Sequence, residues 1–321
     1  MEQGTTGAES HVPGSPFPVP SLSGILNVDK PAGWTSFDVV AFVRRGSGVR
    51  RVGHAGTLDP AATGVLPILL GPATRLAQYL VDTTKVYDAT IELGRETDTY
   101  DADGAVVHRA DASHVGREAV EAALSSFRGE IEQVPPRFSA IKRLGLPLYK
   151  RARRGETVEA PPRRVRVDRL DIISYDPPVL RVEIECGKGF YVRSLAHDVG
   201  ASLGVGGCLT ALRRARVGPF RVEDAVSFDT LGRELASGAW LDRLLPPDEV
   251  LLGWRAAILG EASAQRLAHG RSLLLQPLPG VVVSAGERCR AYSAGGDFLA
   301  VLRCAAPQEW RPEKVFLAQS A

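Results

Sequence analysis

Cysteine is scarce in this chain of 321 residues, which contains four: Cys186, Cys208, Cys289 and Cys304. They lie far apart, and none belongs to a Cys-x-x-Cys pair. This spacing argues against a zinc site and against the disulfide framework of a small secreted domain. We therefore expect reduced thiols and a cytoplasmic location.

A long apolar run is also absent. No stretch approaches the ~20 consecutive apolar residues that a transmembrane helix needs. The N-terminus lacks a basic segment followed by an apolar one, so we expect no secretory signal. The chain is nevertheless 44% hydrophobic and 24% charged, which is ordinary for a globular protein. Its length suffices for one large domain and a small one.

The net charge is only +2, which by itself argues against a nucleic-acid-binding protein. However, residues 137–166 contain ten basic and two acidic side chains, whereas the rest of the chain has 29 basic and 35 acidic ones. A segment with a net charge of +8 would repel itself without an anionic partner. Basic side chains interleaved with Phe138 and Tyr149 suit phosphate contacts and base stacking, which favours RNA binding over a solvated loop. The candidate contacts to the RNA backbone are Arg137, Lys142, Lys150, Arg151, Arg153 and Arg154.

Composition divides the chain into three parts. Residues 1–21 are rich in glycine, serine and proline, as is typical of a disordered tail. Residues 22–247 combine helical and strand-like patterns and include the basic insertion at about 134–166. Residues 248–321 hold short β-rich runs at 272–275, 281–283, 288–292 and 298–302. Such short runs between glycine-rich turns predict a small β-barrel.

Periodicity predicts the main elements of the larger part. Ser36 is expected to cap a helix that buries Val39, Val40 and Val43, and further helices are predicted at 73–81 and 117–128. Residues 86–93 and 181–185 alternate as strands. The acidic run at 94–104 fails as a calcium loop, because an EF-hand alignment puts Ala110 where a glutamate is needed. It is predicted to be a turn whose side chains bond its own backbone.

The most informative stretch is residues 53–67, GHAGTLDPAATGVLP. Three glycines and two prolines in fifteen residues exclude a regular helix and predict a tight loop. The loop contains one histidine, His54, and one carboxylate, Asp59. By itself, Asp59 could simply cap its own loop as an Asx turn.

This stretch resembles the catalytic loop of the bacterial tRNA pseudouridine-55 synthases, in which the aspartate is the nucleophile. Residues 28–36 (VDKPAGWTS) and 85–89 (KVYDA) resemble other segments of the same family. The resemblance implies an α+β catalytic domain on a largely antiparallel sheet. It also implies a small C-terminal RNA-binding β-barrel of the PUA-like type.

The resemblance also implies roles for individual residues. Asp59 would be the nucleophile, Arg193 would pair with it, and the ring of Tyr87 would pack against the target base and take part in catalysis. Further substrate-binding candidates are His54, Tyr191, Leu212 and Lys30, where Lys30 could equally be a structural ion-pair partner. An adjacent Arg193 would keep Asp59 ionised by lowering its pKa.

The implied reaction isomerises the T-arm uridine of tRNA to pseudouridine. The N1–C1′ bond breaks, and the base rejoins the sugar through C5. Asp59 could attack C1′ or C6, or assist loss of a C2′ proton, and the sequence does not choose between them. The reaction involves no redox or group transfer, so we expect no cofactor or metal. The expected partner is tRNA, bound by a monomer without an obligatory protein partner and without a membrane.

Two alternatives remain open at this point. A non-catalytic RNA-binding or RNA-chaperone protein would need the basic segment and the barrel, but it gives no reason for a charged pair in an apolar loop. A hydrolytic N-glycosidase would typically use two carboxylates across the scissile bond, and the Asp59 loop offers one.

Overall fold

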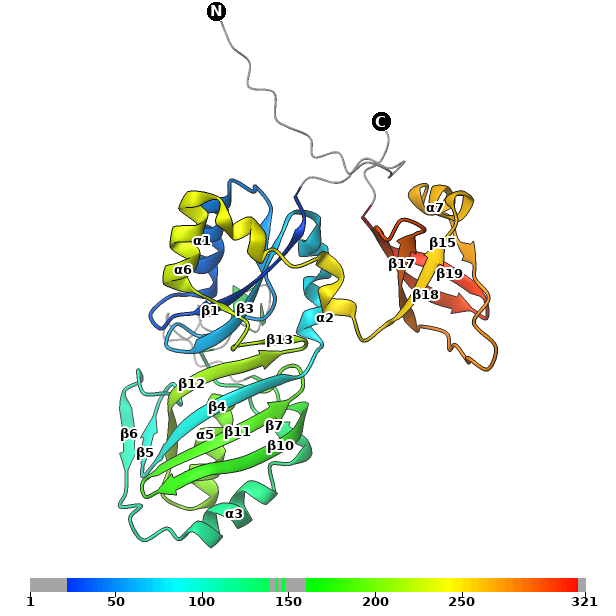
Figure 1. Ribbon diagram of the computed structural model, residues 1–321. Coiled ribbons are helices and arrows are strands. Elements are labelled where there is room, and N and C mark those ends of the chain that lie inside the picture. The colour runs from blue at the N-terminus through cyan, green and yellow to red at the C-terminus, as the bar shows by residue number, and fades with distance from the viewer. Residues whose placement is uncertain (1–21, 139–141, 144–145, 148–159, 317–321) are drawn as a thin grey trace, which may run out of the picture.

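The computed structural model describes residues 22–138, 142–143, 146–147 and 160–316. These residues form two main sheets, one of ten strands and one of five (Figure 1). The larger sheet contains β1 (Gly24–Lys30), β2 (Val52–His54), β3 (Thr63–Leu70), β4 (Lys85–Leu93), β7 (Gly129–Gln133), β10 (Arg163–Asp176), β11 (Val179–Cys186), β12 (Gly207–Val217), β13 (Phe220–Arg221) and β14 (Val226–Ser227). Its main path runs β14-β1-β3-β12-β4-β11-β10-β7.

Most strand pairs of this sheet are antiparallel, as predicted, and the described exceptions are β1 with β14 and β3 with β12. The contact between β3 and β12 is short, since it pairs only Thr63 with Arg213 and Gly64 with Arg214. The sheet is therefore two halves joined at a narrow seam. In Figure 1, β1 and β3 lie in the upper lobe, and β4, β10 and β11 lie in the lower lobe.

Both faces of the β1–β3 half are covered. One face packs on helices α1 (Ser36–Ser47) and α6 (Phe228–Ser237), and the other on η1 (Gly71–Leu76), α2 (Ala77–Val81) and η3 (Pro247–Leu251). Leu66 and Ile68 of β3 belong to the first core, whereas Val65 and Leu69 belong to the second. A strand buried on both faces accounts for the unbroken apolar run of β3.

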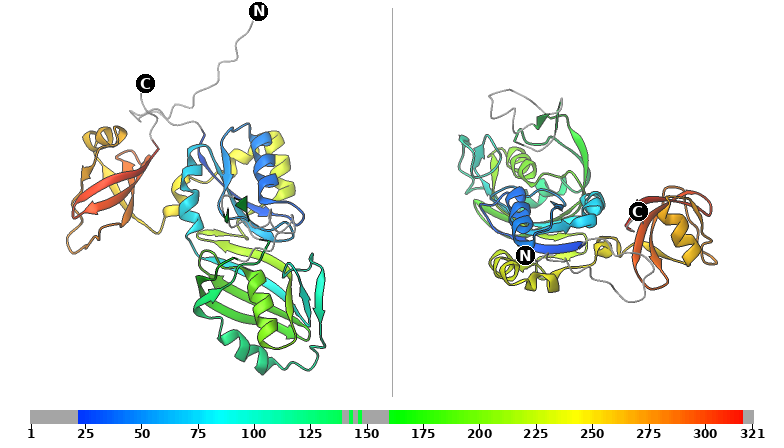
Figure 2. Two further views of the ribbon diagram at one scale, coloured as in Figure 1. Left: turned by 180° about the vertical axis from the view of Figure 1, so that it is seen from behind. Right: turned by 90° about the horizontal axis from the view of Figure 1, so that it is seen from above.

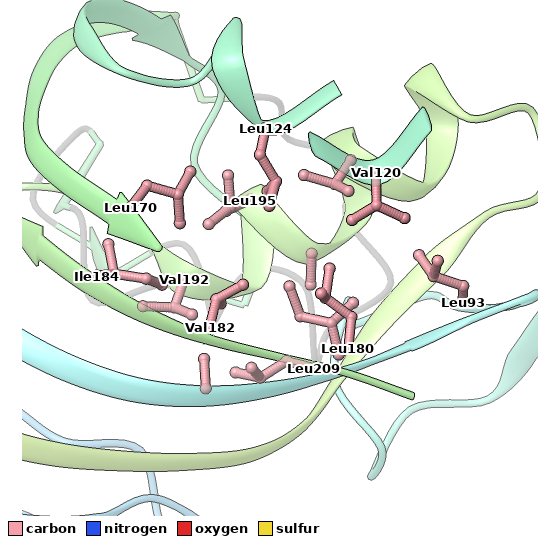
Figure 3. Packing of buried hydrophobic residues seen from close by; sticks show 14 of the residues in the cluster. Leu93, Val120, Leu124, Leu170, Leu180, Val182, Ile184, Val192, Leu195 and Leu209 are labelled. Carbon is pink, nitrogen blue, oxygen red and sulfur yellow. The ribbon is translucent and has the colours of Figure 1, made fainter. Parts of the chain in front are cut away.

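The other half buries its core under α3 (Arg117–Ser125) and α5 (Val192–Ser202). Figure 3 shows Val120 and Leu124 of α3 and Leu195 of α5 packed over Leu180 and the other β-strand side chains. Burial of this apolar surface fixes α5 on the sheet.

The start of α1 differs from the prediction by one residue. Thr35, not Ser36, is the N-cap, and it forms a reciprocal capping box with Asp38. The helix ends at Gly48, which has φ +69°. Ser36 is the first helical residue, and its side chain is buried.

Between these elements lie two short hairpins, a further 3-10 turn and the basic segment. The hairpins are β5 (Arg95–Thr97) with β6 (Val106–Arg109), and β8 (Lys142–Arg143) with β9 (Leu146–Pro147); the turn is η2 (Ala239–Arg243). Residues 163–166, expected within the basic insertion, are instead the first residues of β10. They pair with β7 in the main sheet.

The C-terminal part is a curled five-stranded sheet in the order β15-β17-β18-β19-β16, with helix α7 (Glu261–Ala268) beside it (Figures 1 and 2). Its strands are β15 (Arg255–Leu259), β16 (Leu273–Leu274), β17 (Arg288–Ser293), β18 (Phe298–Ala306) and β19 (Glu309–Val315). The C-terminal part is thus β-rich, as predicted, and the small barrel expected there is a curled sheet. The strand expected at 281–283 is wrong, because these residues form an irregular segment in which Val282 is exposed.

The four cysteines are buried free thiols. Among the described residues, no helix is both long enough and apolar enough to span a membrane.

Candidate active site

The segment between β2 and β3 forms the loop that carries Asp59, and two glycines allow its path. Gly56 has φ +85° and Gly64 has φ +103°, values that L side chains rarely adopt. A Cβ on Gly64 would lie 2.3 Å from the carbonyl oxygen of Arg214, so the close approach of β3 to β12 requires glycine. The loop closes through its backbone, where the Ala62 amide donates to the Asp59 carbonyl oxygen at 3.1 Å.

Three buried polar side chains from different elements hold this loop. Ser36 of α1 binds the backbone of Leu58, Lys30 of β1 binds Pro60, and Arg214 of β12 binds Gly56. Together these contacts hold the backbone on both sides of Asp59. Its carboxylate nevertheless remains accessible, since 46% of the side chain is exposed.

Arg193, in the first turn of α5, lies directly beside Asp59. Its Nε is 3.1 Å from Oδ2 of Asp59, and only 7% of the Arg193 side chain is exposed. Its Nη2 donates to the Phe138 carbonyl oxygen at 2.9 Å. The prediction that Arg193 lies beside Asp59 is therefore confirmed.

Gln133 fixes the start of α5. Its side-chain amide accepts from the Tyr191 amide at 2.8 Å and donates to the Tyr191 carbonyl oxygen at 3.0 Å. Gln133 is buried, so this double contact ties β7 to the residue that begins the helix. It thereby fixes the backbone from which Arg193 extends.

Asp101 is a site residue that the sequence analysis missed. Its Oδ2 lies 3.3 Å from Nη1 of Arg193, so this guanidinium bridges two carboxylates. The other oxygen, Oδ1, accepts hydrogen bonds from Thr99 and Asp103 within its own turn, as predicted for this acidic segment. Nothing in the sequence distinguished Asp101 from the other acidic residues of this turn.

The pKa of Asp59 is raised above its ordinary value. Burial is the main cause; the Arg193 guanidinium opposes it, Asp101 adds to the rise, and the Lys30 ammonium also opposes it. Arg193 thus lowers the pKa of Asp59, as predicted, but burial outweighs this effect and the net shift is upward. Since nearly half of the Asp59 side chain meets solvent, screening by water limits the rise.

Tyr87, Leu212 and Arg214 come together at the seam. Tyr87 of β4 is paired with Arg214 of β12, and Leu212 with Ala89. Alternation along each strand puts Tyr87, Leu212 and Arg214 on the same face of the sheet. Tyr87 and Leu212 are partly buried against the core that also holds α5, the helix that carries Arg193. Burial raises the pKa of Tyr87, and the neighbouring Arg214 opposes this rise.

Lys30 is fully buried, and its ammonium donates to the carbonyl oxygens of Pro31, Trp34 and Pro60 at 2.8, 2.7 and 3.1 Å. Burial lowers its pKa to about 8, although the Asp59 carboxylate raises it again in part. This geometry favours the structural role that the sequence left open for Lys30.

His54 ends β2, just before the Asp59 loop. Its pKa is lowered, first by burial and then by the positive charge of Arg214. Its Nδ1 is buried without a hydrogen-bond partner among the described residues.

The predicted RNA-backbone contacts fall mostly outside the described structure. Arg137 is exposed. Lys142 lies in β8, and nothing is described of its side chain. Lys150, Arg151, Arg153 and Arg154 lie outside the described residues. Within the described ranges, no three His, Cys, Asp or Glu side chains are grouped so that they could hold a metal ion.

The comparisons with known proteins agree with this geometry. Residues 44–192 match the N-terminal domain of the TruB family of pseudouridylate synthases, and residues 193–253 match a tRNA pseudouridylate synthase B C-terminal domain. The chain is 42% identical over 299 residues to tRNA pseudouridine synthase B of Dehalococcoides mccartyi, an alignment that covers 93% of this chain and 98% of that protein. It is 48% identical over 259 residues to the protein of the same name from Thermobifida fusca, covering 78% and 86% of the two chains.

A solved structure supports the fold. A chain of an H/ACA RNP bound to a substrate RNA containing 2′-deoxyuridine superposes with a TM-score of 0.70 at 24% identity, covering 92% of this chain and 86% of that one. At this identity the likeness concerns the fold alone. With the two matched domains and the identities to the bacterial proteins, it leads to one conclusion: the chain belongs to the TruB family of pseudouridylate synthases.

Proposed function

We propose that this protein converts the T-arm uridine of tRNA at position 55 to pseudouridine, with Asp59 as the essential carboxylate. The observation that carries the proposal is the contact between Asp59 and Arg193 at 3.1 Å, formed on the loop that matches the family's catalytic segment. The reaction is a balanced isomerisation. The N1–C1′ bond is broken, a C5–C1′ bond is formed, C5 loses a proton and N1 gains one.

The chain's own residues suit the steps of this reaction. The target nucleobase must leave its stack to reach a carboxylate that is held within a loop. Asp59 is accessible yet anchored, so an incoming nucleotide can meet it without rearrangement of the backbone. Tyr87, Tyr191 and Leu212 supply ring and aliphatic surfaces for the base, and His54 supports the distorted RNA loop.

Binding would depend on the basic segment. Arg137 and the basic residues at 142–154 would contact phosphates, and each contact adds roughly one unit to the dependence of log affinity on log salt concentration. We propose that the protein acts as a cytoplasmic monomer that needs no protein partner.

The test uses an unmodified tRNA transcript labelled with tritium at C5 of uridine. Because the new bond forms at C5, turnover releases tritium to water, whereas an unlabelled transcript is isomerised without a change in mass. A transcript in which cytidine replaces the T-arm uridine should release far less. RNA binding without tritium release would indicate a non-catalytic RNA-binding or chaperone protein. An abasic site would indicate a hydrolase.

Two adjacent hydroxyls allow a matched test of the loop anchor. Ser36→Ala removes the contacts to the Leu58 amide (2.9 Å) and carbonyl (3.2 Å). We expect about 1–3 kcal/mol of lost stability and a kcat lowered about tenfold, because the backbone beside Asp59 loses its anchor. Thr35→Ala removes only the helix cap and should cost about 1 kcal/mol without changing kcat. Thermal unfolding and tritium release measure both effects; equal kcat values in the two variants would contradict the anchoring role.

A further inference from the structure

Arg214 is an unusual residue for the middle of a strand. Its side chain is 1% exposed, among the most deeply buried of the described chain. Its Nε donates to the Val65 carbonyl oxygen at 2.8 Å, and its Nη2 donates to the Gly56 carbonyl oxygen at 3.1 Å. These two acceptors flank the loop that carries Asp59. One guanidinium therefore ties together the two ends of that loop.

The charge of this guanidinium is not balanced by a carboxylate. On the same strand, Arg213 pairs with Asp29 and Arg216 pairs with Glu185. For Arg214, no ion pair is found within the described part of the chain. An arginine stays protonated in proteins, and burying its charge against neutral groups costs free energy that an apolar side chain would not cost. A role at the site would explain its presence.

The Arg214 charge has the hydroxyl of Tyr87 as its hydrogen-bond partner on the strand directly opposite. The other titratable groups that interact with this guanidinium are basic: Lys30, His54 and Lys85. Cys186 and Asp59 also face the phenol. The backbone around Arg214 is shaped to fit it closely. A Cβ on Gly64 would lie 2.3 Å from the Arg214 carbonyl oxygen, whereas a Cβ on Gly56 would make only an ordinary contact with its Nη1. The guanidinium therefore sits between the Asp59 loop and the phenol, with glycine on the loop side.

We propose that Arg214 is a positioning residue that couples the Asp59 loop to Tyr87. Two of its N–H groups fix the loop carbonyls, and the guanidinium directs a further N–H toward the Tyr87 oxygen. The phenol oxygen then accepts from Arg214, so its own O–H is free to point into the site. Negative charge that builds up on this oxygen is stabilised by the adjacent cation. The relevance of this coupling to turnover rests on the proposed function.

The first test measures the ionisation of residue 87 without substrate. A fluorinated tyrosine is incorporated at position 87, and its ultraviolet absorbance is followed against pH in the full-length protein. Arg214→Gln should raise the pKa of this phenol by about one pH unit or more, because a cation that favours the phenolate is lost. Arg216→Gln, on the same strand but paired with Glu185, is the matched control and should leave the titration unchanged. Unchanged titration in Arg214→Gln would overturn the proposal.

The second test measures turnover and covers the case in which Arg214→Gln does not fold. Arg214→Lys keeps the charge but cannot reach both carbonyls and the phenol. Its single-turnover rate should fall about 10- to 100-fold, with the Kd for tRNA within about threefold of wild type. In the Tyr87→Phe background the same change should cost clearly less. An equal loss in both backgrounds would show that Arg214 supports only the loop and would overturn the coupling. If the wild-type protein released no tritium, the proposed function would fail while the phenol titration still tested Arg214.

Discussion

Asp59→Asn is expected to lower the rate of pseudouridine formation by ~10⁴-fold or more, the usual cost of losing an essential nucleophile. The amide keeps the shape of the side chain but carries no negative charge, so it can neither attack carbon nor assist loss of a proton. The three anchors of the loop bind backbone atoms of neighbouring residues and do not use the Asp59 carboxylate. The loop should therefore keep its conformation in this variant.

The measurement is single-turnover tritium release, with the Kd for tRNA determined in parallel. Binding should stay close to that of the wild type. Asp103→Asn, in an exposed turn, serves as a control for removal of a carboxylate elsewhere and should retain full activity. Residual turnover of the Asp59 variant within about tenfold of wild type would exclude Asp59 as the nucleophile.

Substitution of Arg193 should lower activity nearly as much as substitution of Asp59, because its guanidinium charge contacts the Asp59 carboxylate. Its guanidinium contacts Asp59, Asp101 and the Phe138 carbonyl oxygen through three different nitrogens. An ammonium cannot reproduce this fork, so Arg193→Lys should lower kcat by about 10²-fold or more. Arg193→Ala leaves two carboxylates without their shared cation. It should destabilise the fold by about 3 kcal/mol, the lower end for a broken buried pair because Asp59 is partly exposed.

The pH profile separates this role from a purely structural one. Arg193 opposes the raised pKa of Asp59, so its removal should raise that pKa further. If the ionised carboxylate is the active form, the acidic limb of kcat should move to higher pH in Arg193→Gln. Asp101 adds to the raised pKa, so Asp101→Asn should move the same limb to lower pH. Acidic limbs that coincide in all three proteins would contradict the proposed electrostatic role.

Much of the fold could be read from local patterns. The alternation at 86–93 and 181–185 predicted the strands β4 and β11, and the helix at 117–128 is present as α3. The loop predicted over 53–67 is wrong at its end, because residues 63–67 belong to the buried strand β3. The hydrophobic pattern did not predict strands that contain charged residues or proline. Strand β19 has the sequence EWRPEKV and gave no apolar signal, whereas the valines at 281–283 gave a signal without forming a strand.

Site residues could be predicted where the local sequence around them is distinctive, but not where their role depends on contacts with residues far away in the chain. Asp59 stood out because its loop has a distinctive sequence, and Arg193 followed from resemblance. Asp101 was overlooked because local bonds already accounted for one of its oxygens, while its other contact lies 92 residues away in the chain. Arg214 was not singled out, since its burial arises only when β3 and β4 flank β12. Ser36 was assigned the capping role that its neighbour Thr35 performs.

The shared core of the two sheets bears on how far this protein can be divided. Val301 and Phe316, from the C-terminal part, pack in the same cluster as Ile25 and Leu69 of the larger sheet. At the same contact, the Tyr79 hydroxyl donates to Glu313 at 2.9 Å. The C-terminal sheet is therefore not an appendage on a finished domain. A chain truncated before β15 would lose Val301 and Phe316 from the hydrophobic core of its remaining part. We therefore expect the intact protein to unfold in one cooperative transition and not as two independent domains.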